Sequence, residues 1–409
     1  MKKVLFTSYD GLTDNLGQSQ VIPYICGLAQ KGYAMSVLSC EKKEALLRNK
    51  AKVQAQLNSY NIEWKYVEYT RNPPVISTLW DLIRMYTVGC SMFRSTNFNL
   101  IHSRTIISAV MGFKLKEKFK TRFDFDMRGF WADERAESGL WNLSNPVFKL
   151  IYLFFKKKER KFLNEADYVI CLTQKAKTTI HSWKDIPRQP VPIEVIPCCA
   201  DLELFSDKGI DTKLLPQLRQ KLGLTEREFV LCYLGSLGTW YMLDEMLDFF
   251  KCLIEKLPSA KFLFITGDDK EIVIKKSVAK GIPVESLIIT PANREQVPTY
   301  LALANWGIFF IQPVFSKSGS SPTKQGEIMG MGLPLICNAG VGDVDAIVAD
   351  THSGYVLKDF STQTYYAAVE KIMSGRLDKG EIRRGAYKYY SLEKGIEQFE
   401  IVYSKCIPD

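Results

Sequence analysis

The chain has 409 residues, of which 46% are hydrophobic and 24% are charged. This length exceeds one ordinary hydrophobic core and predicts two domains, while the composition is that of a soluble globular protein. The ten cysteines include no Cys-x-x-Cys pair and the three histidines lack metal-ligand spacing, which argues against a disulfide framework and a zinc site.

The net charge of +9 is unevenly distributed along the chain. Residues 1–190 carry 30 Lys and Arg against 17 Asp and Glu, a balance of +13, whereas the remainder carries 24 against 28, a balance of −4. This asymmetry predicts an anionic partner for the first half. The basic residues form no recognisable nucleic-acid module, so an anionic membrane surface fits better than a nucleic acid.

Short apolar runs alternate with helical patterns along the whole chain, which predicts parallel sheets. Predicted strands of the first half are 4–8, 35–39, 63–68, 100–103, 123–127, 168–172 and 194–196, with a helix over 20–30. Those of the second half are 229–234, 261–266, 287–290, 307–311, 333–337 and 354–356, with helices over 242–256, 297–304 and 322–331.

The pattern predicts an α/β protein of two doubly wound, Rossmann-like domains that face each other across a cleft. We place the first domain at 1–190 and the second at 195–386, joined where Pro and small residues break the pattern near Pro197. The last segment, 387–409, has a helical pattern and is expected to cross back to the first domain. Ligands of such sheets bind beyond the carboxyl ends of the strands.

The loop after the first strand, residues 10–20, combines turn formers with the start of a helix. Gly17 would let backbone N–H groups approach a diphosphate closely. An ordinary strand-to-helix loop explains the same residues, and the dinucleotide fingerprint G-x-G-x-x-G is absent.

Charged and aromatic residues gather after the predicted strand at 123–127. Asp126, Arg128 and Glu134 fall in this stretch and are candidate catalytic residues at the ligand edge of the first domain. Asp-x-Asp at 124–126 can bind a divalent metal, although this architecture does not require one. Salt-bridged structural carboxylates are the alternative interpretation.

An apolar and aromatic stretch at 147–155 runs directly into the basic residues Lys156, Lys157 and Lys158. This combination is typical of a helix that lies on an anionic membrane. A core helix with a solvated basic end fits equally well.

The loop at 235–241 follows a predicted strand and precedes a helix. Ser236 and Tyr241 are therefore candidates to line a phosphate pocket. A nicotinamide-binding loop is the rival interpretation, but the fingerprint spacing again fails.

The stretch 320–334 predicts a short helix with Ser321 as N-cap, Pro322 at its first position and Gly332 closing it. The N-terminus of a helix favours a bound phosphate, and Lys324 adds a cation there. Glu327 shares a helix face with Lys324 and is placed to hold a pair of sugar hydroxyls. A capped surface helix with a solvated ion pair is the alternative.

Five stretches together resemble the glycosyltransferase family 4 group of the GT-B fold. They are DGLTDNLGQSQ at 10–20, FDMRGFWADE at 125–134, VIPCCADLELF at 195–205, the loop 235–241, and 321–334 with 338–343. The resemblance implies a retaining transferase whose second domain binds a nucleotide-diphosphate sugar and whose first domain binds the acceptor.

The resemblance also implies roles for individual residues. Glu327 matches the second glutamate of the family's Glu-x7-Glu motif, which holds the ribose, while the first glutamate is replaced by Gly319. Ser236 stands where many members have Arg, and Asp126 where many have His. The implied donor contacts are Gly17, Ser236, Tyr241, Thr290, Pro291, Ala292, Ser321, Thr323, Lys324 and Glu327.

We therefore expect a metal-independent hexosyl- or related glycosyltransferase without a cofactor, acting on a glycan or lipid-linked acceptor in surface polysaccharide or glycoconjugate synthesis. A GT-B sugar-nucleotide epimerase and a non-catalytic nucleotide-sugar or membrane-binding module remain as alternatives. The apolar run after Met1 is too short for a secretory signal, so we expect the cytoplasm, at the inner face of the membrane.

Overall fold

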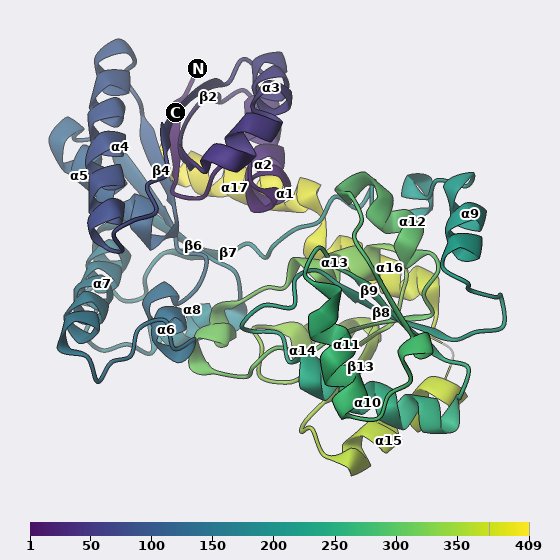
Figure 1. Cartoon of the computed structure of the whole chain (residues 1–409). Coiled ribbons are helices and arrows are strands. Elements are labelled where there is room, and N and C mark those ends of the chain that lie inside the picture. The colour runs from purple at the N-terminus through teal and green to yellow at the C-terminus, as the bar shows by residue number, and fades with distance from the viewer. Residues whose placement is uncertain (376, 409) are drawn as a thin grey trace. The chain divides into compact units, whose positions relative to one another are not determined.

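The computed structural model describes residues 1–375 and 377–408. It divides into two compact units: unit 1 comprises Met1–Pro197 together with Leu392–Asp409, and unit 2 comprises Cys198–Ser391 (Figure 1). The predicted segments 195–386 and 387–409 include residues 376 and 409, which lie outside the described part of the chain. The polypeptide passes from one unit to the other twice, after Pro197 and after Ser391.

Unit 1 is built on seven parallel strands in the order β3-β2-β1-β4-β5-β6-β7. Strands of a parallel sheet are covered on both faces, which is why they read as near-continuous apolar runs. The strands are β1 (Lys3–Ser8), β2 (Ala34–Glu41), β3 (Glu63–Glu68), β4 (Leu100–Arg104), β5 (Arg122–Asp126), β6 (Tyr168–Cys171) and β7 (Ile193–Val195).

Helices cover both faces of this sheet (Figure 1). On one face, α5 (Thr105–Phe119) packs against both α4 (Ile76–Ser95) and α7 (Pro146–Glu165). Elsewhere α2 (Ile22–Gln30) packs against the C-terminal helix α17 (Leu392–Cys406). The remaining helices are α1 (Asn15–Gln20), α3 (Lys43–Ser59), α6 (Trp131–Glu137) and α8 (Gln174–His181).

Unit 2 repeats the architecture with six parallel strands in the order β10-β9-β8-β11-β12-β13. The strands are β8 (Val230–Leu234), β9 (Lys261–Ile265), β10 (Leu287–Thr290), β11 (Trp306–Phe309), β12 (Leu335–Asn338) and β13 (Gly354–Leu357). The helices are α9 (Leu214–Lys221), α10 (Leu243–Lys256), α11 (Lys270–Ala279), α12 (Val297–Leu301), α13 (Thr323–Gly330), α14 (Val344–Thr351), α15 (Thr362–Ser374) and α16 (Lys379–Tyr390).

The predicted fold class of two Rossmann-like α/β units is confirmed, and every predicted strand forms with ends shifted by at most two residues. Three helix boundaries were wrong. The helix expected over 297–304 ends at Leu301. The helix expected over 20–30 is split at Val21, because Pro23 lacks the N–H needed to continue from α1. The C-terminal helix starts at Leu392 instead of 387, because Ser391 is extended and pairs with Ala200.

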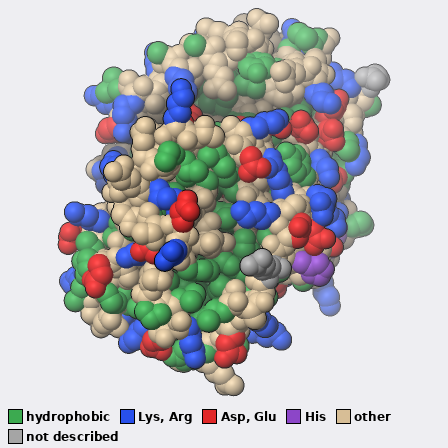
Figure 2. Space-filling view, turned by 90° about the vertical axis from the view of Figure 1, so that its right-hand side faces the viewer, with side chains coloured by type: hydrophobic (Ala, Val, Ile, Leu, Met, Phe, Trp, Pro, Cys, Tyr) green, Lys and Arg blue, Asp and Glu red, His purple; other side chains and the backbone are tan. Residues whose placement is uncertain are grey.

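The surface seen in Figure 2 carries acidic and basic side chains interspersed with apolar ones. Among the described residues, no helix combines the length and the apolar character needed to span a bilayer.

Docking of α17 is expected to contribute strongly to the stability of unit 1. Phe399 is 3% exposed, and its ring centre lies 5.1 Å from that of Tyr24 and 5.6 Å from that of His102. Phe399→Ala should therefore lower the free energy of unfolding by about 3 kcal/mol. Ile401→Ala, at an exposed position of the same helix, should change it by less than about 0.5 kcal/mol.

Urea unfolding of the two variants tests this expectation. Equal midpoints for both would show that α17 lies outside the cooperative structure of unit 1.

Candidate functional site

The helix predicted at 322–331 forms as α13, starting at Thr323. The sequence predicted Ser321 as the N-cap, but Pro322 occupies that position. The reason is tertiary: Ser321 Oγ accepts a hydrogen bond from the Cys198 N–H at 3.2 Å. At the other end Gly332 has the predicted left-handed conformation, with φ of 68°.

Lys324 is 6% exposed, and its ammonium group is enclosed by aromatic rings. Nζ lies 3.5 Å from the ring centre of Tyr241 and 4.1 Å from that of Tyr233, and it donates a hydrogen bond to the Tyr233 hydroxyl at 3.0 Å. A Cβ at Gly235 would come within 3.2 Å of Nζ. Because Gly235 directly follows β8, the ammonium lies at the carboxyl edge of the sheet, where open α/β folds bind ligands.

Removal from water controls the protonation of this amine. Burial lowers the pKa of Lys324 well below its ordinary value, and the nearby Glu327 carboxylate opposes this effect only in part. The faces of the two tyrosine rings attract a cation but do not replace its hydration. An anionic ligand at this edge would favour the charged form.

Glu327 pairs with a residue other than Lys324. Its Oε1 lies 2.9 Å from Arg294, whose guanidinium group also lies over the ring of Phe205 at 5.2 Å. The alternative of a solvated Lys324–Glu327 ion pair is therefore wrong, because both residues are buried and their side chains contact different partners. Arg294 follows the predicted donor loop of Thr290, Pro291 and Ala292, so the ion pair ties that loop to α13.

The loop at 235–241 encloses the ammonium group of Lys324. Ser236 is exposed, and its carbonyl accepts a hydrogen bond from the Tyr233 hydroxyl, which fixes the ring beneath Lys324. Burial raises the pKa of Tyr241 to about 12, so this phenol stays neutral and presents a ring face to the cation.

Sequence reasoning missed two residues near this edge. Lys317 is 6% exposed, with Nζ 3.9 Å from the ring centre of Trp240. Gln325 is fully buried beside Lys324, and neither of its amide atoms has a hydrogen-bond partner among the described residues. Residues 316–321 are Ser, Lys, Ser, Gly, Ser and Ser, and no local pattern there singles out Lys317.

In unit 1 the predicted Asp126 is the last residue of β5 and is 1% exposed. His102 of the neighbouring strand β4 lies between two carboxylates, with Nδ1 2.8 Å from Asp124 Oδ2 and Nε2 3.5 Å from Asp126 Oδ2. Sequence reasoning missed His102, a single histidine inside an apolar run. The signal that could have found it is strand register, because His102 pairs with Asp124 across the sheet.

Further cations reach the same edge of unit 1. Arg104 lies 2.6 Å from Asp10 Oδ2, and Arg128 lies 3.9 Å from Asp126 Oδ1. Arg128 has a φ of 57°, an uncommon conformation for a residue with a side chain. We call these residues the edge cluster: Asp10, His102, Arg104, Asp124, Asp126 and Arg128.

Charges within the edge cluster set the protonation of its members. Burial lowers the pKa of His102, but Asp124 and Asp126 outweigh it and raise the pKa to about 9. Burial raises the pKa of Asp124, and His102 offsets the rise only in part. At Asp126, burial is outweighed by Arg128, His102 and Arg104, so the pKa is lowered.

At neutral pH the edge cluster therefore contains a protonated His102 and an ionised Asp126. The alternative interpretation of salt-bridged structural carboxylates accounts for these ion pairs, but it leaves some polar atoms of the cluster without a hydrogen bond in the described part of the chain. Asp126 Oδ1 and Arg104 Nε are buried and make no hydrogen bond among the described residues. Hydroxyl groups of a ligand are suitable partners for both atoms.

Gly17 lies inside α1 instead of in the preceding loop, where it was expected. A Cβ at this position would come within 2.1 Å of the Gly11 carbonyl oxygen, so close packing alone requires glycine there. The loop itself is held by the fully buried Glu41, which accepts hydrogen bonds from the N–H groups of Leu12 and Thr13.

Glu134 lies in the first turn of α6, next to Asp133, which anchors that helix to α7. Asp133 accepts a hydrogen bond from Tyr152 at 2.8 Å and pairs with Lys156 at 2.7 Å; Lys156 also lies 2.6 Å from Glu159. The predicted membrane contact through Lys156 is wrong, because its ammonium group is held in these ion pairs within unit 1. Lys157 is exposed and Lys158 is half-buried.

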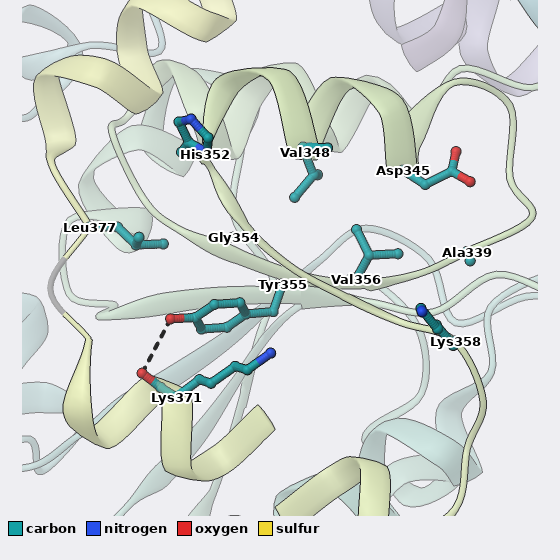
Figure 3. Close-up of a pocket in the computed structure, with 11 residues that line it drawn as sticks. Ala339, Asp345, Val348, His352, Gly354, Tyr355, Val356, Lys358, Lys371 and Leu377 are labelled. Atoms are coloured by element: carbon teal, nitrogen blue, oxygen red, sulfur yellow. Dashed lines mark hydrogen bonds between the residues drawn. The ribbon is translucent and has the colours of Figure 1, made fainter. Parts of the chain in front are cut away.

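A separate cavity of about 460 Å³ lies at β13, the edge strand of unit 2 (Figure 3). Figure 3 shows Tyr355 on its floor, with the Tyr355 hydroxyl donating a hydrogen bond to the Lys371 carbonyl at 3.3 Å. His352 of the rim has a left-handed φ of 47°. None of the predicted site residues lines this cavity.

Comparisons with known proteins agree with this architecture. Residues 21–204 match the family model Glycosyltransferase Family 4, and residues 216–389 match the model Glycosyl transferases group 1. No curated protein sequence matches the chain.

Solved structures resemble the chain over almost its whole length. Sucrose-phosphate synthase from Thermosynechococcus elongatus is 15% identical, with a TM-score of 0.68 and coverage of 99% of each chain. HepE from Anabaena in complex with UDP-glucose is 12% identical, with a TM-score of 0.71 and coverage of 99% of this chain and 100% of HepE. A putative UDP-N-acetylglucosamine 2-epimerase from Listeria monocytogenes is 10% identical, with a TM-score of 0.60 and coverage of 98% and 96%. At these identities the likeness shows the fold.

The pKa of His102 predicts how stability depends on pH. Because the pKa rises from about 6.5 in the unfolded chain to about 9 in the folded one, the stabilisation is complete below pH 6.5 and is lost as the pH rises through 9. It amounts to about 3 kcal/mol at most. Urea unfolding of the wild type should show a free energy of unfolding that falls between these pH values. In His102→Gln the contribution of His102 to this fall should be absent. An identical decline in the variant would contradict the assignment.

Proposed function

We propose, on the premise that the chain belongs to the glycosyltransferase family 4 group of the GT-B fold, that it transfers a sugar from a nucleotide-diphosphate sugar to a glycan or lipid-linked acceptor. The transfer retains the configuration of the sugar and serves the synthesis of a surface polysaccharide or glycoconjugate. The enzyme acts in the cytoplasm, at the inner face of a membrane. Family membership and the UDP-glucose held by HepE support a nucleotide-sugar donor.

The environment of Lys324 is the observation that carries this proposal. When the bond between the sugar and the diphosphate breaks, negative charge accumulates on the departing phosphate oxygen. Preorganised cations and N–H groups stabilise such charge strongly in a site that excludes water. Lys324 and the first N–H groups of α13, with Thr323 and Ser321 beside them, are the groups we assign to this task. Metal independence follows as part of the proposal, since these groups supply the charge.

The nucleoside is assigned to neighbouring residues of unit 2. Glu327 holds the ribose hydroxyls through its carboxylate, which Arg294 orients by the 2.9 Å ion pair. Thr290, Pro291 and Ala292 face the base, and Ser236 and Tyr241 adjoin the diphosphate. Gly17 is left out of the donor contacts, because its packing against Gly11 accounts for the glycine.

Unit 1 is assigned the acceptor. Asp126, kept ionised by Arg128, His102 and Arg104, positions the acceptor hydroxyl. The hydroxyl oxygen bonds to the anomeric carbon as the bond from that carbon to the diphosphate breaks, and the hydroxyl proton passes to the departing phosphate oxygen. Glu134 is a second candidate for that positioning. Both assignments rest on the place of these residues at or beyond the carboxyl end of β5.

A GT-B epimerase is the second candidate, and the fold likeness to the putative 2-epimerase favours it. The two functions differ in their products, because an epimerase releases no free nucleotide diphosphate at steady state. A non-catalytic module would bind the nucleotide sugar without turning it over.

Lys324→Met is expected to lower kcat for release of free UDP from a UDP-sugar by roughly 100-fold or more. Methionine fills a similar volume without a charge, so the fold should persist. The matched control is Lys275→Met, at an exposed lysine of α11 in the same unit, and it should retain full activity. Wild-type turnover in the Lys324 variant would remove Lys324 from the mechanism, and loss of wild-type turnover in EDTA would contradict metal independence.

Nucleotide binding is expected to take up a proton. Because burial lowers the pKa of Lys324, a bound diphosphate should restore the charge and draw up to about one proton from solution at neutral pH. Affinity for UDP should correspondingly rise as the pH falls toward that lowered pKa. Calorimetric titrations in two buffers of different ionisation enthalpy measure the uptake, and Lys324→Met should give the same heat in both. Buffer-independent heats for the wild type would refute the assignment.

A further inference from the structure

Three helices of unit 1 share one direction and one face of the sheet. Each of α4, α5 and α7 leads from the carboxyl end of one parallel strand to the start of the next, and α5 contacts both of the others. The first halves of the three helices therefore lie toward the carboxyl edge of the sheet and the second halves toward the opposite edge. Figure 1 shows the three helices together at one side of unit 1.

Large apolar side chains are exposed on the first halves of α4 and α7. Spacings of three and four residues place them on one face of each helix, and their exposed fractions lie between 48% and 68%. We call this set the apolar band: Ile76, Leu79, Trp80 and Ile83 of α4, and Val147, Leu150, Leu153 and Phe154 of α7. Large apolar side chains that gather in this way on exposed helix faces mark an interaction surface.

Cations gather on the second halves of α5 and α7, next to the apolar band. We call Lys114, Lys157, Lys158 and Lys161 the basic cluster. Burial and the charges of the other three lysines lower the pKa of Lys158, with Glu117 the only counter-charge among the main contributors. Lys158 Nζ lies 5.5 Å from the ring centre of Phe154, so the cluster adjoins the band. Crowded like charges of this kind favour a polyanionic partner.

We propose that the apolar band and the basic cluster dock unit 1 onto the surface of an anionic lipid bilayer. An amphipathic helix lies in the membrane interface when its apolar face enters the acyl boundary and its lysines meet anionic headgroups. Six of the eight side chains of the apolar band are aliphatic and offer no stacking platform to the bases of a nucleic acid. A symmetric dimer through this face would bury the apolar band of one copy against that of the other. The basic clusters would then lie at the rim of the interface without an anionic partner. The bilayer fits both chemical features.

Vesicle flotation of the full-length chain tests the proposal, with vesicles of phosphatidylcholine containing about 30% phosphatidylglycerol and with vesicles of phosphatidylcholine alone. The wild type should bind the anionic vesicles, bind the neutral ones far more weakly, and be released by high salt. Lys157→Gln with Lys158→Gln should weaken binding about 30-fold. Leu150→Ser with Phe154→Ser should weaken it at least about tenfold.

Matched controls are available in unit 2. Ile272→Ser with Val278→Ser removes two exposed apolar side chains of α11, and Lys275→Gln removes one exposed charge; both variants should bind vesicles like the wild type. UDP binding and melting temperature, measured on every variant, separate this proposal from the transferase proposal. Loss of vesicle binding with both values unchanged supports membrane docking whatever the fate of the transferase assignment.

Three outcomes would overturn the proposal. The first is equal binding of the wild type to neutral and anionic vesicles, or binding that high salt does not weaken, and neither observation requires a variant. The second is unchanged binding by both surface variants. The third is a dimer in light scattering that the Leu150 and Phe154 changes dissociate while the wild type binds no vesicles, which would assign the surface to a second copy of the chain.

Discussion

The proposed donor chemistry depends on one interaction: an ammonium group enclosed by two tyrosine rings at the end of a buried strand. Lys324 contacts the faces of Tyr233 and Tyr241 and donates to the Tyr233 hydroxyl. The rings attract the charge but do not replace the hydration that burial removes, so the pKa of Lys324 is lowered and a bound anion would favour the charged form. The folded protein thus holds a buried amine at a position where the negative charge of a diphosphate would stabilise its protonated form.

The two units differ in how they treat buried charge. In the edge cluster of unit 1, carboxylates and cations compensate one another, and the outcome is a carboxylate, Asp126, that stays ionised at the end of β5. In unit 2 the cation of Lys324 has no carboxylate within ion-pair distance among the described residues, since Arg294 engages Glu327. The ionised carboxylate of unit 1 is suited to orienting a hydroxyl group, and the amine of unit 2 is suited to stabilising negative charge.

Residues could be predicted from the sequence where local pattern decides the structure. Parallel strands are apolar on both faces, and the α13 region carries its own start and stop signals, which directed attention to Lys324 and Glu327. Residues whose surroundings come from distant segments were missed or misassigned. His102 and Arg104 depend on strand register, Ser321 is diverted by the Cys198 N–H, and Lys156 is drawn inward by Asp133 and Glu159. A linear charge pattern contains none of these pairings.

Crossing of the last helix into unit 1 has a consequence for synthesis on the ribosome. Helix α17 supplies Tyr403, whose hydroxyl lies 3.2 Å from His102 Nδ1, and Phe399, which packs on Tyr24. Both leave the ribosomal tunnel roughly 200 residues after the rest of unit 1. Domains generally fold as they emerge, but unit 1 lacks α17 until residues 392–406 have been synthesised, so its charged interior stays open to solvent until then. The intervening unit can complete its own sheet during that interval, so the order of maturation is the reverse of the order of synthesis.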